Sequence, residues 1–381
     1  MICDVSEAIA YALVDLGVQL VTHVPGYGGS QTFQKYNAIS MHNPVVSFNE
    51  EVAYTIAHGC AIAGKRSASM MKTHGIAKAG NSVTDSLYTD LTAGMIVLVF
   101  DDKTGLHSDN ILETEILLKG MSMPYLISRH ENIYSEITKA YDYSEKKKLP
   151  VAIIIDSAVI ENKIEITRSE SLKKTFEYKR DIIKHIVHPL FAGYQYNLFK
   201  ARRNGSDTTS IVRPTIPAYT ECNKFKSSEK YLQFFEAFKN VRCDIVTGDT
   251  SSSCMFMLPP YNSIDITTHI GGSIPLALGA YHAGFRKVWA LTGDFGFIAA
   301  GHMGLIEVLE RDIPLKVVIF YNKEASATGG QKIHKRIMLR LLAGYDSFIK
   351  HISNPNDLIE VSEVLKEVSE SDSFKIILVD Y

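Results

Sequence analysis

The chain has 381 residues, of which 46% are hydrophobic and 22% are charged, and its formal net charge is -2. These values are ordinary for a globular protein, and they give no whole-chain signal for binding nucleic acid or a membrane surface. The apolar runs are too short to span a bilayer, and the N-terminus lacks the basic flank and apolar run of a signal peptide. The five cysteines are scattered, without a CxxC pair, which favours a cytoplasmic location over a disulfide frame or a self-contained iron–sulfur cluster.

Residues 1–165 alternate between helical and strand patterns. The apolar spacing of residues 6–16 and 50–64 predicts two helices. Apolar runs at residues 19–23, 95–101 and 151–156 predict strands. The last two runs are apolar on both faces, which is typical of a parallel sheet covered by helices on both sides.

Residues 166–215 depart from this alternation, because they are rich in Lys and Arg and lack a strand period. We predict an interdomain linker there, with a solvated basic surface favoured over a partner-docking role. From residue 216 the alternation returns, with strands predicted at 243–248, 288–292, 315–321 and 375–380 and a helix at 274–283. The sequence therefore predicts an α/β fold of two doubly wound parallel-sheet domains, at residues 1–165 and 216–381.

The strongest motif is Gly-Asp-Phe-Gly at residues 293–296, followed by Asn-Lys-Glu at residues 322–324. Each segment follows a predicted buried strand, and ligands gather at the carboxyl ends of strands in an open parallel sheet. The Asp294 carboxylate, the Asn322 side-chain oxygen and the main-chain carbonyl of Glu324 would offer Mg²⁺ three oxygen ligands, with phosphate oxygens and water completing its shell. A Gly-Asp pair after a strand can also be an ordinary turn with a helix cap.

A second segment supports an anion site. Gly271, Gly272 and Ser273 open a predicted helix, and small residues at such a start form a backbone nest for anions. This loop alone is weak evidence, but together with the motifs around Asp294 and Asn322, in the right order and spacing, it becomes strong. The predicted cofactor-binding residues of this half are Gly271, Gly272, Ser273, Gly293, Asp294 and Phe295.

These motifs resemble the diphosphate-binding domain of thiamine-diphosphate enzymes, whose signature is Gly-Asp-Gly followed further along by Asn. The chain departs from that signature at its third position, where it has Phe295. The resemblance implies thiamine diphosphate and Mg²⁺ as cofactors, with Asp294, Asn322 and Glu324 as the metal ligands.

The N-terminal half contains a matching part. Asn49 and Glu50 open a predicted helix, and Gly59 follows nine residues after Glu50. This resembles the pyrimidine-binding domain of the same enzymes, in which the carboxylate hydrogen-bonds N1′ of the aminopyrimidine and promotes loss of the thiazolium C2 proton. The resemblance implies that Glu50 is catalytic. Without it, Glu50 and Glu51 would be read as first-turn helix acids.

Further segments resemble the alpha subunit of indolepyruvate:ferredoxin oxidoreductase. They are residues 23–30, 71–75, 101–113 and 325–331, so the resemblance covers both predicted domains. It implies that Pro25 and Gly26 bind the cofactor. It also implies that His74 and His107 are acid–base or carboxylate-binding groups near the thiazolium, although loop histidines are common for ordinary hydrogen-bonding reasons.

The chain also differs from that subunit. It ends at Tyr381 without the subunit's C-terminal ferredoxin-like segment, it has no extra domain between its halves, and Cys222 stands alone where the subunit has a Cys-rich motif. Electron transfer would then need a separate electron-transfer subunit. The two-domain size instead resembles the sulfopyruvate and phosphonopyruvate decarboxylases.

We predict a thiamine-diphosphate-dependent 2-oxoacid oxidoreductase component that cleaves a 2-oxoacid through a thiazolium enamine. The family pairs its domains across a subunit interface, which implies a homodimer or larger, and we expect no nucleic-acid or membrane partner. One alternative is a stand-alone 2-oxoacid decarboxylase. The other is a degenerate, non-catalytic homologue that binds the cofactor, which Phe295 and the missing cysteines keep open.

Overall fold

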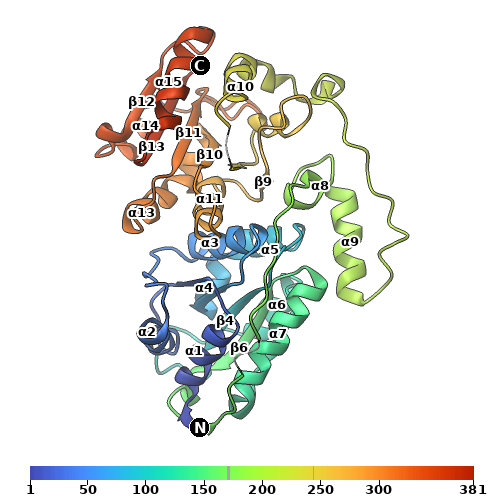
Figure 1. Ribbon diagram of the computed structural model, residues 1–381, viewed down its shortest axis with the longest axis vertical. Helices are drawn as coiled ribbons and strands as arrows, with labels where there is room; N and C mark the ends of the chain where they lie inside the picture. The colour runs from blue at the N-terminus through green and yellow to red at the C-terminus, as the bar shows by residue number, and fades with distance from the viewer. Residues whose placement is uncertain (170–171, 243) are drawn as a thin grey trace. The chain divides into compact units, whose positions relative to one another are not determined.

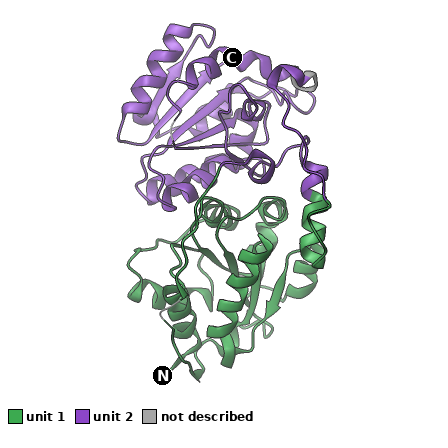
Figure 2. Cartoon of the chain, turned by 45° about the vertical axis from the view of Figure 1, so that its right-hand side comes forward, with its two compact units in different colours: residues 1–179, 196–210 green, residues 180–195, 211–381 purple. Residues whose placement is uncertain are grey.

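The computed structural model describes residues 1–169, 172–242 and 244–381, and it divides into two compact units (Figure 2). Unit 1, in green, comprises Met1–Lys179 and Tyr196–Ser210, and unit 2, in purple, comprises Arg180–Gln195 and Ile211–Tyr381. Each unit is an α/β structure around a parallel sheet, so the predicted fold class is confirmed. No helix within the described ranges is both long and apolar enough to cross a membrane.

Unit 1 is built on a five-stranded parallel sheet with the strand order β2-β3-β4-β6-β5. The strands are β2 (Leu20–His23), β3 (Ser67–Lys72), β4 (Met95–Asp101), β5 (Tyr125–Ile127) and β6 (Val151–Asp156). Every residue of β4 is buried, as expected of a central strand covered on both faces. A separate antiparallel pair joins β1 (Ile2–Asp4) to β7 (Lys163–Glu165).

Helices cover both faces of the unit 1 sheet (Figure 1). On one face, α1 (Val5–Asp15) packs against α2 (Gly29–Ile39) and α7 (Ile133–Lys147), and the three share a core with the sheet. On the other face, α3 (Glu50–Ile62) packs on β2 and β3 together with α4 (Thr73–Lys78) and α5 (Gly80–Ser86). The short α6 (Thr114–Gly120) follows β4 in the chain.

Helix α3 begins at Glu50 because of a side-chain cap. The Asn49 side chain accepts a hydrogen bond from the backbone N–H of Val52 at 3.1 Å, which satisfies one of the unpaired donors of the first turn. Glu50 is therefore held at the start of the helix, as the sequence predicted.

Unit 2 is built on a six-stranded parallel sheet with the strand order β12-β13-β11-β10-β8-β9. The strands are β8 (Ile245–Gly248), β9 (Ile266–Thr267), β10 (Val288–Gly293), β11 (Lys316–Tyr321), β12 (Ile349–Ile352) and β13 (Lys375–Asp380). The three strands β11, β10 and β8 are neighbours. The loops that follow them therefore meet at one edge of the sheet.

The unit 2 sheet is also covered on both faces (Figure 1). One face carries α10 (Leu232–Phe238) and α15 (Leu358–Glu370), which share an aromatic and aliphatic core with the sheet. The other carries α11 (Ser273–His282), which packs on β8 and β10 and against α13 (His302–Glu310). Two short helices, α12 (Asp294–Gly296) and α14 (Lys335–Leu341), follow β10 and β11 in the chain.

The stretch predicted as a linker contains two helices, α8 (Ile182–His185) and α9 (Ala192–Asn204), and is divided between the two units. The polar composition of this stretch gave no pattern from which α9 could be predicted. A few specific contacts within unit 1 stabilise this helix. Phe199 packs with Leu87 and Leu149, and the Arg202 guanidinium pairs with the Asp90 carboxylate.

Candidate functional site

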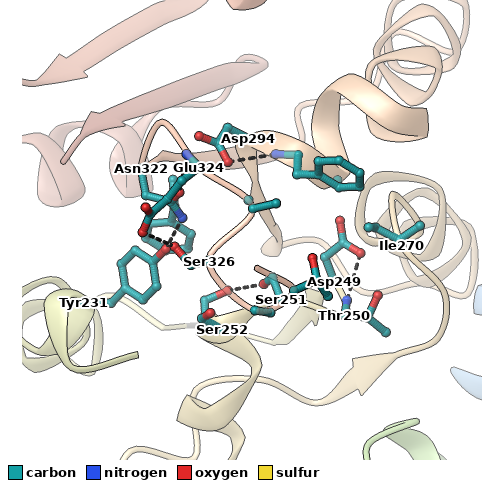
Figure 3. A pocket seen from close by; sticks show the side chains of 18 residues that line it. Tyr231, Asp249, Thr250, Ser251, Ser252, Ile270, Asp294, Asn322, Glu324 and Ser326 are labelled. Carbon is teal, nitrogen blue, oxygen red and sulfur yellow. Dashed lines mark hydrogen bonds between the residues drawn. The ribbon is translucent and has the colours of Figure 1, made fainter. Parts of the chain in front are cut away.

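A cavity lies at the carboxyl edge of the unit 2 sheet, where β8, β10 and β11 end (Figure 3). It includes about 600 Å³ of space between the atoms, part of which is open solvent. Three loops supply most of its polar lining: residues 249–253 after β8, 293–296 after β10, and 322–328 after β11. Tyr231, from a distant part of the sequence, completes it.

Asp294, the predicted metal ligand, is buried in this cavity wall with 1% of its surface exposed. Its two carboxylate oxygens accept backbone hydrogen bonds from Phe295, at 2.8 Å, and Lys323, at 2.7 Å. Burial raises the pKa of Asp294 to about 6, and these backbone N–H groups oppose that rise. A buried carboxylate without a neutralising partner in contact favours a cation beside it.

Asn322 and Glu324 lie on the loop that Lys323 ties to Asp294. The Asn322 side-chain oxygen accepts the backbone N–H of Glu324 at 3.0 Å, and its amide nitrogen donates to the Tyr231 hydroxyl at 2.6 Å. The Glu324 carboxylate accepts from Ser326, at 2.7 Å, and its side chain is therefore engaged within the loop. If Glu324 contributes to a metal site, its main-chain carbonyl remains the candidate atom, as predicted from the sequence.

The loop after β8 is a part of the site that sequence reasoning missed. It brings a buried acid and a run of hydroxyl groups to the cavity: Asp249, Thr250, Ser251, Ser252 and Ser253. In Figure 3 the side chains of Thr250, Ser251 and Ser252 lie on the side of the cavity away from Asn322. A hydroxyl run directly after a buried strand was the available signal, because such groups donate hydrogen bonds to anionic oxygens at strand ends.

The Asp249 carboxylate stabilises this edge of the cavity through hydrogen bonds. It accepts hydrogen bonds from the backbone N–H groups of Thr250 and Gly271 and from the Thr292 hydroxyl, each at 2.8 Å. Burial raises the pKa of Asp249 to about 6, although these three donors oppose the rise. Asp249 thereby connects the ends of β8 and β10 to the start of α11.

Gly296, and not the unusual Phe295, is the sterically demanding position of the motif. A Cβ atom on Gly296 would lie 2.2 Å from Asp249 Oδ2, whereas the Phe295 side chain is 48% exposed. The Phe295 backbone N–H still donates to Asp294. The departure from Gly at position 295 therefore leaves the Asp294 loop intact.

We expect Gly296→Ala to destabilise unit 2 by about 1–3 kcal/mol, since the added methyl group must displace a carboxylate fixed by three donors. The backbone angles of Gly296 are helical (φ -61°, ψ -41°), so the steric conflict alone decides the outcome. Trp289 is the one tryptophan of the chain and is buried in β10, and its fluorescence during urea unfolding reports on this unit. Gly293→Ala is the control, because its Cβ would meet no atom closer than 3.7 Å. Equal midpoints for the two variants would show that the packing argument is wrong.

The predicted anion nest at residues 271–273 has the expected local structure but does not line the cavity, which Ile270 reaches instead. Helix α11 begins at Ser273, and Gly271 has a positive φ of 77°, with its Cβ position 2.6 Å from the Cβ of Ala300. Glycine is required there by both conformation and space. The buried Ser273 hydroxyl has no hydrogen-bond partner among the described residues. The role of this nest stays a prediction.

These residues fit a diphosphate with a divalent cation. The described part of the chain contains no cluster of three His, Cys, Asp or Glu side chains that could hold a metal. Mg²⁺ needs no such cluster, because one carboxylate combined with amide, carbonyl, phosphate and water oxygens suits it. Asp294 and Asn322 provide the first two kinds of oxygen, and the hydroxyl loop faces the space that phosphate groups would fill.

In unit 1, the predicted catalytic acid Glu50 lies against α4. A Cβ on Gly75 would come within 2.8 Å of the Glu50 Cγ, so this glycine leaves room for the acid. Glu50 Oε2 lies 2.8 Å from Lys78 Nζ, an ion-pair distance, but without the geometry of a hydrogen bond. Among the described residues Oε2 has no hydrogen-bond partner, so this oxygen can accept a hydrogen bond from a ligand. Lys78 was not singled out from the sequence.

The other predicted residues of unit 1 follow β2, β3 and β4. A Cβ on Gly26, next to Pro25, would lie 2.7 Å from the Lys72 side chain, and Lys72 Nζ donates to the main-chain carbonyl of His107. The His107 ring stacks on Tyr27 with 3.6 Å between ring centroids. Lys72 thus joins the loop after β2 to the loop after β4, and it is a second residue that sequence reasoning missed.

His74, on α4, is half-buried and shares a hydrogen bond with Asn110 of the loop after β4. The structure therefore gathers His74, His107, Pro25 and Gly26 at the carboxyl edge of the unit 1 sheet, with Glu50 packed on the same helix that carries His74. Their catalytic and binding roles stay predictions.

Comparison with known families identifies the cofactor domain. Residues 248–370 match the family described as thiamine pyrophosphate enzyme, C-terminal TPP binding domain. This range contains the hydroxyl loop, Asp294 and Asn322. Over these residues the chain is similar to the cofactor domain of thiamine-diphosphate-dependent enzymes. The predicted resemblance is confirmed, and the match supports an enzyme role with thiamine diphosphate as the ligand of this domain.

Two sequence relatives each match about 150 residues of the chain. Indolepyruvate oxidoreductase subunit IorA of Methanothermobacter marburgensis is 29% identical over 152 residues, which is 39% of this chain and 25% of that protein. IorA of Thermococcus kodakarensis is 28% identical over 147 residues, or 38% and 23% of the two chains. The match thus spans about a quarter of the length of these relatives.

Two solved structures share the fold over 99% of both chains, each with a TM-score of 0.68. One is a thiamin diphosphate-dependent enzyme from Mycobacterium smegmatis, which is 14% identical to this chain. The other is a thiamine diphosphate-dependent 4-hydroxybenzoylformate decarboxylase from Rhodococcus jostii, which is 13% identical. At such low identity these likenesses concern the fold alone.

Proposed function

We propose that the chain is a thiamine-diphosphate- and Mg²⁺-dependent component of a 2-oxoacid oxidoreductase. The observation that carries this proposal is the meeting of Asp294, Asn322 and the hydroxyl loop around one cavity at the carboxyl edge of three neighbouring strands. The IorA relatives favour the oxidoreductase class. The 2-oxoacid that is cleaved is left open.

In this proposal the residues of unit 2 hold the cofactor. The Asp294 carboxylate and the Asn322 oxygen bind Mg²⁺ together with the diphosphate, and the hydroxyl groups of residues 250–253 donate hydrogen bonds to phosphate oxygens. The cation supplies the positive charge that stabilises the ionised form of the buried Asp294 carboxylate. Bound thiamine diphosphate supplies a nucleophilic carbon for the 2-oxoacid carbonyl and an electron sink for the loss of CO₂.

In this proposal, residues of unit 1 promote loss of the thiazolium C2 proton and bind the substrate. The Glu50 carboxylate would hold the aminopyrimidine through a hydrogen bond to N1′ and would accept or donate a proton there. His74 and His107 would bind the substrate carboxylate or transfer protons near it. The family resemblance implies pairing between subunits, and we also propose that the protein is a homodimer or larger, which light scattering on purified protein tests directly.

A stand-alone decarboxylase is the second candidate, favoured by the whole-chain fold likeness to the 4-hydroxybenzoylformate decarboxylase. The two functions differ in the fate of the electrons left after CO₂ is lost. An oxidoreductase passes them to an acceptor, whereas a decarboxylase protonates the intermediate and releases an aldehyde.

An assay over a panel of small and aromatic 2-oxoacids, including indolepyruvate, separates these functions. We expect CO₂ release coupled to reduction of an added redox dye, with little aldehyde when the dye is omitted, and no activity in Asp294→Ala. Aldehyde formed at full rate without dye would replace the oxidoreductase assignment with the decarboxylase. The absence of CO₂ under both conditions would favour the degenerate, cofactor-binding homologue.

A further inference from the structure

The Asn322 amide is held by two hydrogen bonds, one from the nearby Glu324 backbone and one to Tyr231, which is far away in the sequence. An Asn side chain has an oxygen and an NH₂ group of similar size, and only the oxygen can bind a cation. Here the oxygen accepts the Glu324 backbone N–H at 3.0 Å, and the NH₂ group donates to the Tyr231 hydroxyl at 2.6 Å. Rotation of the amide by 180° would place two donors, the NH₂ group and the Glu324 N–H, against each other.

The Tyr231 hydroxyl can donate or accept, and it accepts here because the Glu324 N–H directs the Asn322 NH₂ group toward it. Tyr231 is 2% exposed, and its ring packs against the rings of Phe320 and Tyr381, with centroid distances of 4.9 Å and 4.8 Å. Its neighbour Lys230 holds the other end of the same loop, because Lys230 Nζ donates to Glu324 Oε1 and to the Ser326 hydroxyl at 3.2 and 3.1 Å.

We propose that Tyr231 is a positioning residue of the metal site: its hydroxyl holds the NH₂ group of Asn322, so that the amide oxygen faces the cation. The inference rests on the proposed function, since it assumes that Asn322 is a metal ligand. It goes beyond that function because it assigns a role to a residue outside the recognised motifs. Groups that orient metal ligands typically change metal affinity by about 10- to 100-fold when they are removed.

Mn²⁺ binding in the presence of saturating thiamine diphosphate, followed by electron paramagnetic resonance, tests this role. Tyr231→Phe keeps the ring and removes the hydroxyl, and we expect it to weaken Mn²⁺ binding by about 10- to 100-fold. Tyr381→Phe is a matched control, because its buried hydroxyl has no hydrogen-bond partner among the described residues. That variant should bind Mn²⁺ like the wild type.

The Tyr231→Phe substitution in an Asn322→Asp protein separates an effect on the orientation of the amide from an effect on side-chain packing. In Asn322→Asp the side chain offers an oxygen in either orientation, so adding Tyr231→Phe should there cost no more than a few-fold in affinity. The same loss in both backgrounds, or equal losses for Tyr231→Phe and Tyr381→Phe, would reduce Tyr231 to a packing residue. Wild-type binding by Tyr231→Phe would refute its role while leaving the metal site standing. No Mn²⁺ binding by the wild type would overturn the metal site and this inference together.

Discussion

Replacing Asp294 with Ala is expected to weaken thiamine diphosphate binding in the presence of Mg²⁺ by about 100- to 1,000-fold, which corresponds to removing one partner of a buried charge pair. Asp294 is the one carboxylate of the proposed metal shell, and it is almost fully buried. Titration calorimetry with and without Mg²⁺ measures the effect. The wild type should show metal-dependent binding, and the variant should bind weakly under both conditions.

The fold of this variant should be unaffected, because the loss of two backbone hydrogen bonds is offset by removal of a buried carboxylate whose pKa burial has raised to about 6. Asp380→Ala is the control. It removes an acid from the end of β13, next to β11 at the same edge of the sheet, that does not line the cavity. Asp380 pairs with the Lys323 and Lys335 side chains, so its loss leaves the Lys323 backbone N–H in place to hold Asp294. We expect its cofactor affinity to stay within a few-fold of the wild type. Unchanged affinity in Asp294→Ala would refute the metal-site assignment.

The second large effect concerns Glu50. We expect Glu50→Gln to slow the exchange of the thiazolium C2 proton for deuterium by about 100- to 10,000-fold, the usual contribution of a general acid–base group. Gln keeps the size of the side chain but cannot share a proton with N1′. Rapid quench followed by NMR measures the exchange without a known substrate. Cofactor affinity should change much less, because the diphosphate and Mg²⁺ supply most of the binding.

Glu51→Gln is the matched control for this experiment. Glu51 stands in the same first turn of α3, and its side chain accepts from Asn81 at 3.4 Å. Near-normal exchange in Glu51→Gln, with slow exchange in Glu50→Gln, assigns the function to one carboxylate. If both variants exchange as fast as the wild type, Glu50 is an ordinary helix acid.

The parts of the fold that the sequence predicted well are strands buried on both faces. The observed β4, β10 and β11 agree with the predicted runs to within one residue, because continuous apolar segments bounded by turn residues have few other structures open to them. The start of the run predicted at 243–248 lies outside the described residues at Cys243, and the observed β8 begins at Ile245.

Strand β3 was not predicted, and the reason is physical. Its sequence begins Ser-Ala-Ser, which looks polar, yet both serines are fully buried. The Ser67 hydroxyl donates to the Ala57 carbonyl at 2.6 Å, and Ser69 shares a hydrogen bond with Thr22 at 3.1 Å. Buried hydroxyl groups are tolerated when they are hydrogen-bonded in this way, but their partners are distant in sequence and cannot be read from the strand itself.

Some residues of the candidate site could likewise be predicted from the sequence, and others could not. Asp294, Asn322 and Glu50 could be found because each is part of a short motif next to a predictable strand or helix. Tyr231 could not, since it reaches Asn322 across 91 residues from a stretch without a periodic pattern. The tolerance of Phe295 also depended on the structure, which shows that the tightly packed position is Gly296.

Crystals grown with thiamine diphosphate and Mn²⁺ in place of Mg²⁺ test the central claim most directly, because anomalous scattering locates the metal without prior assumptions. The account predicts one strong peak in the unit 2 cavity, within about 2.5 Å of an Asp294 carboxylate oxygen and of the Asn322 side-chain oxygen, with the diphosphate completing the shell. A bound cofactor whose metal lies away from Asp294 and Asn322, or no cofactor in the cavity at saturating concentration, would contradict the account.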